Sequence, residues 1–346
     1  MNSPLLKARK IEVTFRTRRA GRAVTVAAVR GIDLDLFRGQ TLGLVGESGS
    51  GKSTLARALL KLVPMAGEIE IDGEQVAHLG SRHFRRYRRK IQMVFQDPYS
   101  SLDPSMTVGD SIAEPLVVHA RMTPGQRAAR VAEVLRQVNL PPEVADRYPD
   151  EFSGGQRQRI AIARAIALDP EILICDEAVS ALDISTQNQI IHLLETLQER
   201  SGLAYLFISH DLAVVRHISD RVAVMYLGEV IEEGPVDRIY DQPAHPYTQV
   251  LLNAVPVASP AAQRIRSATV LEGDVPDPTN PPPGCVFSGR CPLAMPRCFR
   301  DPPAPFDLPT GGRVRCHLHD DGPRLAGASV SALMAARQQD RPETAR

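Results

Sequence analysis

Residues 46–54 combine glycines, hydroxyls and one lysine in a spacing that suits a bound polyphosphate. They read Gly-Glu-Ser-Gly-Ser-Gly-Lys-Ser-Thr and match the pattern G-x-x-x-x-G-K-[ST]. Glycines let successive backbone N–H groups turn inward, and the start of a following helix adds positive potential. Lys52 is then expected to contact the β- and γ-phosphates of ATP, and the Ser53 hydroxyl to ligate Mg²⁺. The residues predicted to hold ATP here are Gly46, Glu47, Ser48, Gly49, Ser50, Gly51, Lys52, Ser53 and Thr54.

Two neighbouring carboxylates follow an apolar run further along the chain. Ile172–Cys175 is short and apolar, as expected for a buried strand, and it ends in Asp176 and Glu177. Beside a phosphate loop, Asp176 suits holding Mg²⁺, and Glu177 suits activating the attacking water as a general base. A solvated Asp-Glu turn is the alternative, and the phosphate loop makes it the less favoured one.

Two further side chains stand at the ends of apolar runs. Gln96 follows the run Ile91–Phe95 and could bridge Mg²⁺ or the attacking water. His210 follows the run Leu203–Ile208 and could reach the γ-phosphate. A single histidine is more often structural, so the prediction for His210 depends on this context. Together with Lys52 and Glu177, both are predicted to act in catalysis.

Residues 152–156, Phe-Ser-Gly-Gly-Gln, form a second glycine-rich segment. Its hydroxyl, N–H groups and following helix could close on a phosphate. The phosphate loop already occupies that role within one subunit. This segment therefore makes chemical sense if a second subunit brings a nucleotide to it, which predicts ATP bound at a shared interface.

The apolar patterns predict the elements that position these residues. Residues 10–96 alternate as strands, and residues 151–235 alternate strands with helices, including a helix Thr186–Arg200 stopped by Gly202. Residues 97–150 show helical spacing at Val131–Val138, ended by prolines. A hairpin is expected around Gly228. The predicted fold class is α/β: a P-loop core with an antiparallel β subdomain, a helical insertion and a small Cys-rich C-terminal appendage.

Composition limits the class of protein. The 346 residues exceed one average domain, and the net charge of +1 gives no general attraction to nucleic acid or anionic lipid. No apolar run approaches the roughly 20 residues that span a bilayer, and the N-terminus lacks a signal peptide's apolar stretch. The expected location is cytosolic or peripheral on a cytosolic membrane face. Because that compartment is reducing, the five cysteines are not expected to form structural disulfides.

The motifs resemble, in order, those of the ATP-binding subunits of ABC transporters. Walker A (46–54), the Q-loop Gln96, a signature with Phe152 in place of leucine, Walker B with Glu177, the D-loop (180–183) and the switch His210 are all present. The resemblance covers about residues 8–320. It implies two subunits facing head to tail, with each ATP held by one Walker A and the partner's signature. It adds as ATP-binding residues Ser153, Gly154, Gly155, Gln156, Asp183 and Phe15, whose ring would stack on adenine or, about as readily, pack in the core.

Three longer strings resemble the dipeptide/oligopeptide importer branch: residues 94–104, residues 175–183 and His245-Pro-Tyr-Thr. The sequence of residues 177–180, Glu-Ala-Val-Ser, is more similar to that of the second, F-type, ATPase of the usual heterodimer. This resemblance implies a second ABC ATPase subunit, two integral-membrane permease subunits and, indirectly, a periplasmic or extracellular substrate-binding protein. It also implies a position at the cytoplasmic face of the cell (inner) membrane. Nickel and glutathione importers share the branch and are the alternatives for the cargo.

Four cysteines lie in a proline- and glycine-rich stretch near the C-terminus. Their spacing, C-x5-C-x6-C-x17-C, lacks the paired C-x2-C of most zinc ribbons and leaves zinc and iron–sulfur level. The importer resemblance favours a [4Fe–4S] cluster, with Zn²⁺ as the alternative, in which His317 or His319 could substitute, and unliganded thiols as the third and least favoured. The predicted ligands are Cys285, Cys291, Cys298 and Cys316. The fifth, Cys175, is expected to be a buried small hydrophobe.

The expected domains are 1–240 for the nucleotide-binding domain, with a helical insertion at about 97–165, then 241–325 for the importer-type region and 326–346 for a flexible tail. A competing function is a nucleic-acid ATPase of translation or DNA repair. Its best support is a basic run with few stacking aromatics: Arg82, Arg85, Arg86, Arg88, Arg89 and Lys90. Such a run is usually a solvated face, and no nucleic-acid partner is expected.

Overall fold

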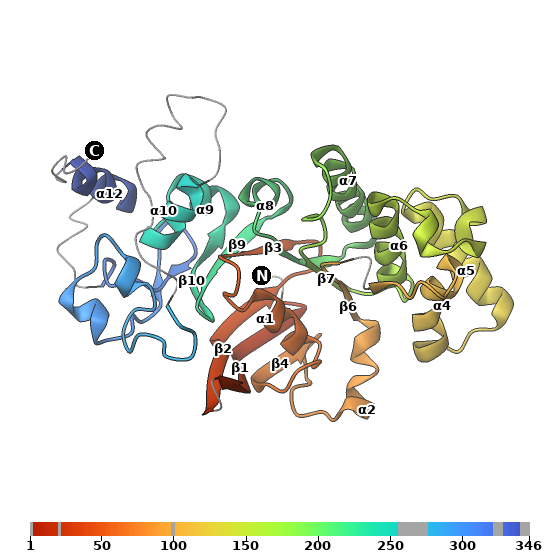
Figure 1. The fold of residues 1–346 in the computed structure, drawn as a ribbon, viewed down its shortest axis with the longest axis horizontal. Helices are drawn as coiled ribbons and strands as arrows, with labels where there is room; N and C mark the ends of the chain where they lie inside the picture. Colours follow the sequence, from red (N-terminus) through yellow and green to blue (C-terminus); the bar gives the residue numbers. More distant parts are fainter. Residues whose placement is uncertain (1–2, 20–21, 98–100, 255–275, 321–327, 340–346) are drawn as a thin grey trace. The chain divides into compact units, whose positions relative to one another are not determined.

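The computed structural model describes residues 3–19, 22–97, 101–254, 276–320 and 328–339. The chain divides into two compact units, each built from several stretches of sequence (Figure 1). The first unit comprises Met1–Ile11, Asp33–Gly43 and Leu55–His210. The second comprises Glu12–Ile32, Leu44–Thr54 and Asp211–Arg346. Residues 98–100, within one of the strings resembling importers, lie outside the described residues.

Parallel strands form the centre of the first unit, in the order β3-β8-β7-β6. They are β3 (Thr41–Val45), β6 (Ile91–Val94), β7 (Ile172–Asp176) and β8 (Ala204–Ile208). Every residue of β7 and β8 is buried, which explains their unbroken apolar sequence. The register pairs Val94 with Cys175 and Asp176 with Ile208. The carboxyl ends of β6, β7 and β8 therefore lie side by side, and the predicted catalytic residues follow directly after them.

Helices α4 (Val108–His119), α5 (Pro124–Gln137), α6 (Gly154–Ile166) and α7 (Ile184–Ser201) complete most of this unit, with the short turns η2 (Pro142–Asp146) and η3 (Pro149–Glu151). The first three pack on one another, and α6 also contacts α7 and β6. Helix α7 ends at Gly202 in the left-handed conformation, as predicted. Helix α4 is absent from the sequence expectations because Pro115 interrupts its apolar pattern.

A four-stranded sheet has the order β2-β1-β4-β5. Its strands are β1 (Leu6–Arg19), β2 (Arg22–Leu36), β4 (Ala66–Ile71) and β5 (Glu74–Gln75). The first unit holds β4, β5, the beginning of β1 and the end of β2, and the second unit holds the remainder of β1 and β2. The short elements α2 (Ser81–Phe84) and η1 (Tyr87–Arg89) follow this sheet in the first unit.

Strands in the order β11-β12-β10-β9-β3 organise the second unit, and the neighbours from β11 to β9 pair antiparallel. Strands β9 (Arg221–Tyr226) and β10 (Glu229–Pro235) form the predicted hairpin, with Gly228 at a φ of 82°. Two later strands, β11 (Phe306–Asp307) and β12 (Arg313–Val314), extend it, and Val314 pairs with Glu232. The region after residue 240 thus adds strands to the hairpin formed by β9 and β10.

The remaining elements of this unit are α8 (Leu212–Ile218), α9 (Val236–Asp241), α10 (Pro246–Asn253), η4 (Ser288–Arg290), η5 (Pro296–Phe299) and α12 (Val330–Gln339). Helix α12 lies within residues 326–346, the expected tail, for which the sequence allows at most one helix. Its Val330 and Met334 are buried against Val250, Leu293 and Leu318. Apolar side chains at i and i+4 give α12 one packing face, and this helix is therefore ordered.

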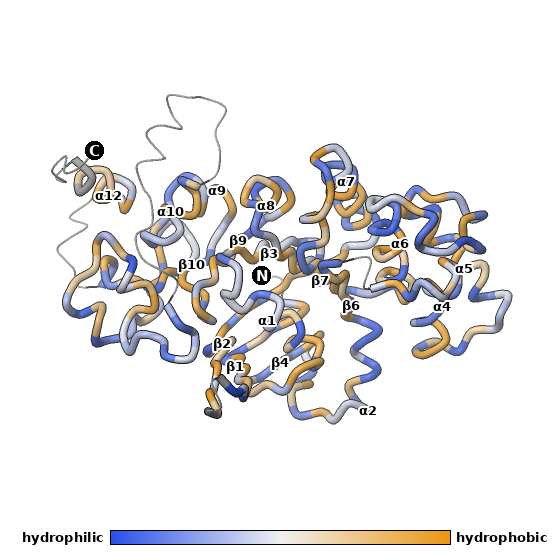
Figure 2. The backbone as a smooth tube through the Cα atoms, in the orientation of Figure 1, coloured by the Kyte–Doolittle hydropathy of each residue, from blue (hydrophilic) through white to orange (hydrophobic). Residues whose placement is uncertain are grey.

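Hydropathy follows this arrangement (Figure 2). Hydrophobic residues run through β7 and β9, whereas the segment beside α2 is mostly hydrophilic. Among the described residues, no helix combines the length and the apolar character needed to cross a bilayer.

Candidate functional site

The structure divides the predicted site residues between the two units. The phosphate loop, residues 46–54, belongs to the second unit together with Phe15. The first unit holds Gln96, Asp176, Glu177 and His210, as well as the 152–156 segment.

The phosphate loop joins β3 to α1 (Lys52–Leu59), as the sequence predicts. Gly51 has a φ of 103°, and a β-carbon there would lie 2.2 Å from the carbonyl oxygen of Ala28. At Gly46 the corresponding distance to the carbonyl oxygen of Met225 is 2.1 Å. Both positions therefore require glycine because other backbone approaches too closely for a side chain.

Lys52 is buried within this loop, with 5% of its surface exposed. Its Nζ donates hydrogen bonds to the carbonyl oxygens of Gly46, at 2.8 Å, and Glu47, at 2.9 Å. A weaker contact of 3.4 Å reaches the Ser50 hydroxyl. Backbone carbonyls of the loop thus hold the Lys52 ammonium group in place, where it could also contact a bound phosphate.

Glu177 is the point where the predicted catalytic residues of the first unit meet. The Gln96 side-chain amide donates to Glu177 Oε2 at 2.7 Å, and His210 Nδ1 lies 3.5 Å from Oε1. Neighbouring Asp176 is almost fully buried. The sequence assigned these roles separately, and the sheet brings Gln96, Glu177 and His210 together because the three residues follow adjacent parallel strands.

The backbone at Glu177 is held in a less common conformation, with a φ of 50°. Its N–H donates to the carbonyl oxygen of Ile208 at 3.0 Å, and its carbonyl accepts from the N–H of Ser180 at 3.1 Å. This conformation turns the side chain away from the strand direction and toward Gln96 and His210. A left-handed conformation at a non-glycine residue is costly and concentrates at functional positions.

The 152–156 segment forms the amino-terminal cap of α6. The Ser153 hydroxyl accepts from the N–H of Gln156 at 3.4 Å, and Gln156 Oε1 accepts from the N–H of Ser153 at 3.0 Å. A β-carbon at Gly155 would lie 2.3 Å from Thr186 Cγ2 on α7. Phe152 is buried, so its replacement of leucine is a matter of core packing.

Asp183 and Phe15 have local environments that bear on their predicted roles. Asp183 caps α7, and hydrogen bonds from Ser185 and Thr186 hold the pKa of its carboxyl well below the usual range. Phe15 is 39% exposed on β1, which excludes core packing as its main role. Its stacking on adenine stays a prediction, as does the contact of Asp183 with nucleotide.

The four C-terminal cysteines are free thiols within the second unit. The N–H of Cys285 donates to the carbonyl oxygen of Cys298 at 2.8 Å. Burial raises the pKa of Cys285 to about 11. The pKa of Cys316 is raised by burial first and then by Cys285, Cys291 and Cys298. Cys285 and Cys298 are therefore neighbours in the fold, and four thiols are a donor set that suits zinc or an iron–sulfur cluster in kind.

The metal-ligand geometry is a separate matter. Across the described ranges, no three or more His, Cys, Asp or Glu side chains are gathered closely enough to hold a metal ion. His317 contacts Asp320 and the carbonyl of Asp301, and His319 contacts the carbonyl of Ala244. Both histidines are thus engaged outside the cysteines. Cys175 is fully buried in β7, which confirms the prediction of a buried small hydrophobe, and burial raises its pKa to about 12.

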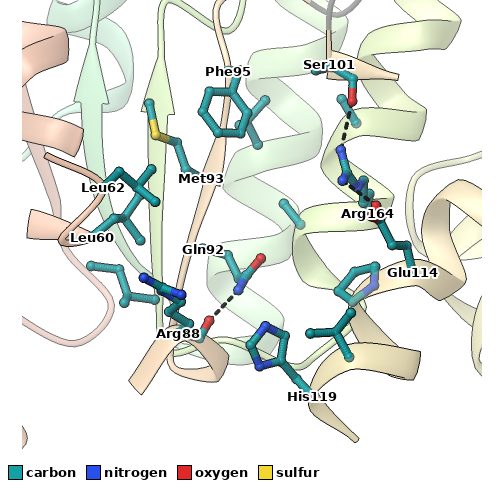
Figure 3. A pocket seen from close by; sticks show the side chains of 16 residues that line it. Leu60, Leu62, Arg88, Gln92, Met93, Phe95, Ser101, Glu114, His119 and Arg164 are labelled. Carbon is teal, nitrogen blue, oxygen red and sulfur yellow. Dashed lines mark hydrogen bonds and ion pairs between the residues drawn. The ribbon is translucent and has the colours of Figure 1, made fainter. Parts of the chain in front are cut away.

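A cavity of about 310 Å³ opens in the first unit near the end of β6 (Figure 3). Phe95 and Val118 line it and are partly exposed, although they are apolar. Arg164 lies at one side, donating to the carbonyl of Ser101 at 2.7 Å and pairing with Glu114 at 2.5 Å. The sequence analysis did not predict this cavity. Its signal was the pair of apolar residues, Val117 and Val118, on the solvent-facing end of α4.

Sequence reasoning also missed two side chains that contact the phosphate loop. Tyr247 and Arg290 both bind Glu47, from 200 and 243 residues further along the chain. Local spacing carries no signal of such a contact.

Comparison with known proteins adds family information to this geometry. Residues 29–180 match the ABC transporter family, and residues 231–298 match the family described as the oligopeptide/dipeptide transporter, C-terminal region. One relative is the "Probable peptide ABC transporter ATP-binding protein y4tS" of Sinorhizobium fredii. It is 51% identical over 309 residues, which cover 89% of this chain and 87% of the relative. The oligopeptide transport ATP-binding protein AppF of Bacillus subtilis is 51% identical over 296 residues, covering 85% and 90%.

Among solved structures, the chain is similar to the ATP-binding cassette MJ0796 in a dimeric post-hydrolysis state bound to ADP and Pi. The TM-score is 0.60 and the identity 31%, over 67% of this chain and 98% of that one. A second similar structure is cbiO1 from Clostridium perfringens, described as part of the transporter complex cbiONQ. It has a TM-score of 0.59 and 26% identity, over 69% and 91% of the two chains.

Proposed function

The chain belongs to the ATP-binding proteins of ABC transporters, in the oligopeptide/dipeptide branch, and from this premise we propose that it hydrolyses ATP to power import of dipeptides or oligopeptides through a partner permease. The observation that carries the proposal is the meeting of Gln96 and His210 at the carboxylate of Glu177. Such a carboxylate, held at the end of a buried strand, is arranged to activate water.

In this proposal the predicted site residues bind and hydrolyse ATP. Lys52 and the loop N–H groups bind the β- and γ-phosphates. Ser53, Gln96 and Asp176 would hold Mg²⁺, which would supply further positive charge to these phosphates. Glu177 accepts a proton from the attacking water. The water oxygen forms a bond to the γ-phosphorus, while the bond between the γ-phosphorus and the oxygen that leaves with ADP breaks. His210 contacts the γ-phosphate and, through its contact with Glu177, keeps that carboxylate in place.

A second subunit completes the site in this proposal. Ser153, Gly154 and Gly155 begin a helix whose N–H groups suit a γ-phosphate brought by a partner. Gln156, Asp183 and Phe15 are the remaining proposed nucleotide contacts. The importer branch pairs two different ATPases, and we propose a heterodimer of that kind.

The cavity beside β6 is the proposed contact with a permease. Residues of β6, α4 and α6 form it, and one of its lining residues, Phe95, directly precedes Gln96 in the sequence. A permease segment bound there would therefore contact both the helical insertion and the strand that leads to Gln96. Partly exposed apolar side chains at its rim suit a short helix of the permease. Contact with a permease would place the chain at the cytoplasmic face of the membrane. A binding protein on the far side of the membrane would be an indirect partner.

The four cysteines are proposed to hold a [4Fe–4S] cluster, with Zn²⁺ as the alternative. Four thiols in one segment and the importer branch support this assignment. The test is an iron and sulfide assay after anaerobic purification, in which we expect about four irons per chain. Stoichiometric zinc without iron, or neither metal, would overturn the assignment.

The experiment that tests the function is isolation of the native membrane complex, followed by ATPase assays with candidate cargoes. Stimulation by di- or oligopeptides in a complex that contains integral-membrane permeases is the expected result. Stimulation by nickel or glutathione alone would reassign the cargo. Absence of any permease, together with salt-sensitive binding of nucleic acid, would reject the importer function.

A further inference from the structure

Three contacts within the second unit converge on Glu47, the second residue of the phosphate loop. Its N–H donates to the hydroxyl of Tyr247 at 2.9 Å. Its carboxylate accepts from Arg290 Nη1, at 2.9 Å to Oε2 and 3.2 Å to Oε1. Its carbonyl oxygen accepts from Lys52 Nζ at 2.9 Å. Glu47 thus joins the C-terminal region to the lysine of the phosphate loop.

The His-Pro-Tyr string explains why Tyr247 reaches this place. His245 Nδ1 accepts from the N–H of Tyr247 at 3.0 Å and so caps α10, while Pro246 occupies the first helical position. The N–H of His245 in turn donates to Glu232 Oε2 at 2.9 Å. Glu232 is fully buried and also pairs with Arg238. These contacts fix the start of α10 on the hairpin and aim Tyr247 at the loop.

Arg290 is held just as closely. Only 9% of its side chain is exposed, and its Nη1 also lies 3.2 Å from the hydroxyl of Tyr226. Tyr226, Tyr247 and Phe287 pack ring against ring, with centroids 4.6 to 5.4 Å apart. Buried aromatic contacts of this kind leave a side chain few alternative positions. Arg290 and Tyr247 are therefore rigidly placed groups.

We propose that Tyr247 and Arg290 are positioning residues for nucleotide binding, through which the C-terminal region sets the conformation of the phosphate loop. The proposal rests on the proposed ATP site and adds to it a function for the His-Pro-Tyr region. The hydroxyl of Tyr247 accepts a hydrogen bond from the N–H of Glu47, and Arg290 binds the carboxylate of Glu47. The carbonyl that contacts Lys52 is thereby fixed from both sides.

The physical consequence concerns the affinity for ATP more than the rate of hydrolysis. Without these contacts, the loop samples more conformations, and ordering it becomes part of the cost of binding. The catalytic carboxylate belongs to the other unit, where its contacts are with Gln96 and His210. A loss of the C-terminal contacts is therefore expected to raise the dissociation constant for MgATP and leave kcat nearly unchanged.

The test compares Tyr247→Phe and Arg290→Gln in the full chain, by equilibrium binding of MgATP and by steady-state ATPase. Each variant removes one contact, and we expect the dissociation constant and KM to rise about three- to tenfold, with kcat within about twofold. Arg290→Lys keeps the charge and should restore part of the affinity. The matched control is Arg297→Gln, since Arg297 lies in the same region, is half-exposed and pairs with Asp301 and Asp320.

The outcomes separate this proposal from the proposed ATP site. Lys52→Ala should bind MgATP poorly. If it does, and both Tyr247→Phe and Arg290→Gln bind within twofold of the parent, the positioning role is wrong and the ATP site stands. If Lys52→Ala binds normally, the site fails and the positioning role fails with it. Should Arg290→Gln not fold, Arg290→Lys and Tyr247→Phe decide the question by the same measurements.

Discussion

At the scale of single residues, the candidate site depends on which atoms a side chain meets rather than on its type. Glu177 is one of many carboxylates in the chain, yet it contacts both Gln96 and His210. The basic run at 82–90 shows the opposite case. Arg86 pairs with Glu74, and Lys90 pairs with Asp72 and Glu171, so part of its charge is already neutralised. A run of like charges is therefore a weaker signal than one well-placed carboxylate.

The first prediction concerns Glu177. Glu177→Gln keeps the shape and the hydrogen bond to Gln96 but removes the base, so turnover should fall by about 10²–10⁴-fold. ATP affinity should change little because the phosphate loop is untouched. Single-turnover hydrolysis and nucleotide binding measure the two effects. Glu143→Gln, at an exposed carboxylate, is the control, and near-normal hydrolysis in Glu177→Gln would refute its role as the base.

At the scale of elements, caps and strand ends place the functional groups. Helix α7 was predictable because Gly202 stops a regular apolar pattern. Helix α4 was not, since Pro115 obscures the pattern and packing on α5 and α6 maintains the helix. The start of α10 adds a titratable cap. Burial, and then the charge of His319, lowers the pKa of His245 to about 3.

This cap predicts a pH dependence of stability. In the unfolded chain His245 has its ordinary pKa of about 6.5 and gains a proton below that pH. In the folded chain its pKa is about 3, so it stays neutral down to about pH 3. Stability is thus fully present above about pH 6.5 and falls with decreasing pH, by up to about 1.4 kcal/mol per pH unit from this group. Urea unfolding at about pH 7 and about pH 5 measures the slope. His245→Asn keeps a capping oxygen and should flatten it; an identical slope would contradict the assignment.

A glycine in the phosphate loop provides the next prediction. Gly51→Ala places a β-carbon against the carbonyl oxygen of Ala28, at a φ that side chains rarely adopt. We expect a loss of about 2–4 kcal/mol in unfolding free energy, measured by denaturant titration. Gly31→Ala is the control, because Gly31 also has a positive φ of 69° but open space around it. That variant should lose only about 1–2 kcal/mol, and equal losses would show that the close approach is unimportant.

At the scale of the whole molecule, the predicted site residues are divided between the two units. The phosphate loop and its contacts with the C-terminal region lie in one unit, and the carboxylate of Glu177 and the 152–156 cap lie in the other. The C-terminal region contributes β11 and β12 to the antiparallel sheet, so it is structurally continuous with the nucleotide-binding domain. In the proposed function, the molecule acts together with a second ATPase subunit and a permease.

Dimer formation is the prediction at this scale. With MgATP and the companion subunit, Glu177→Gln should form a stable dimer, measured by analytical ultracentrifugation. Adding Ser153→Arg should prevent it by placing a large charged side chain at the cap of α6. Thr123→Arg changes an equivalent capping box on α5 and should leave the dimer intact. A preparation that stays monomeric in the presence of nucleotide, companion and permease would contradict the shared site.

The sequence by itself determined the chemistry of this protein: the phosphate loop, the carboxylate pair, the 152–156 cap and the family to which they belong. These features are local, because short spacings prescribe the turns and strand ends that carry them. Only the tertiary structure decided that Gln96 and His210 meet at Glu177, and that Tyr247 and Arg290 hold Glu47. Such contacts join residues far apart in the chain, and they depend on strand order and side-chain packing, which no local pattern encodes.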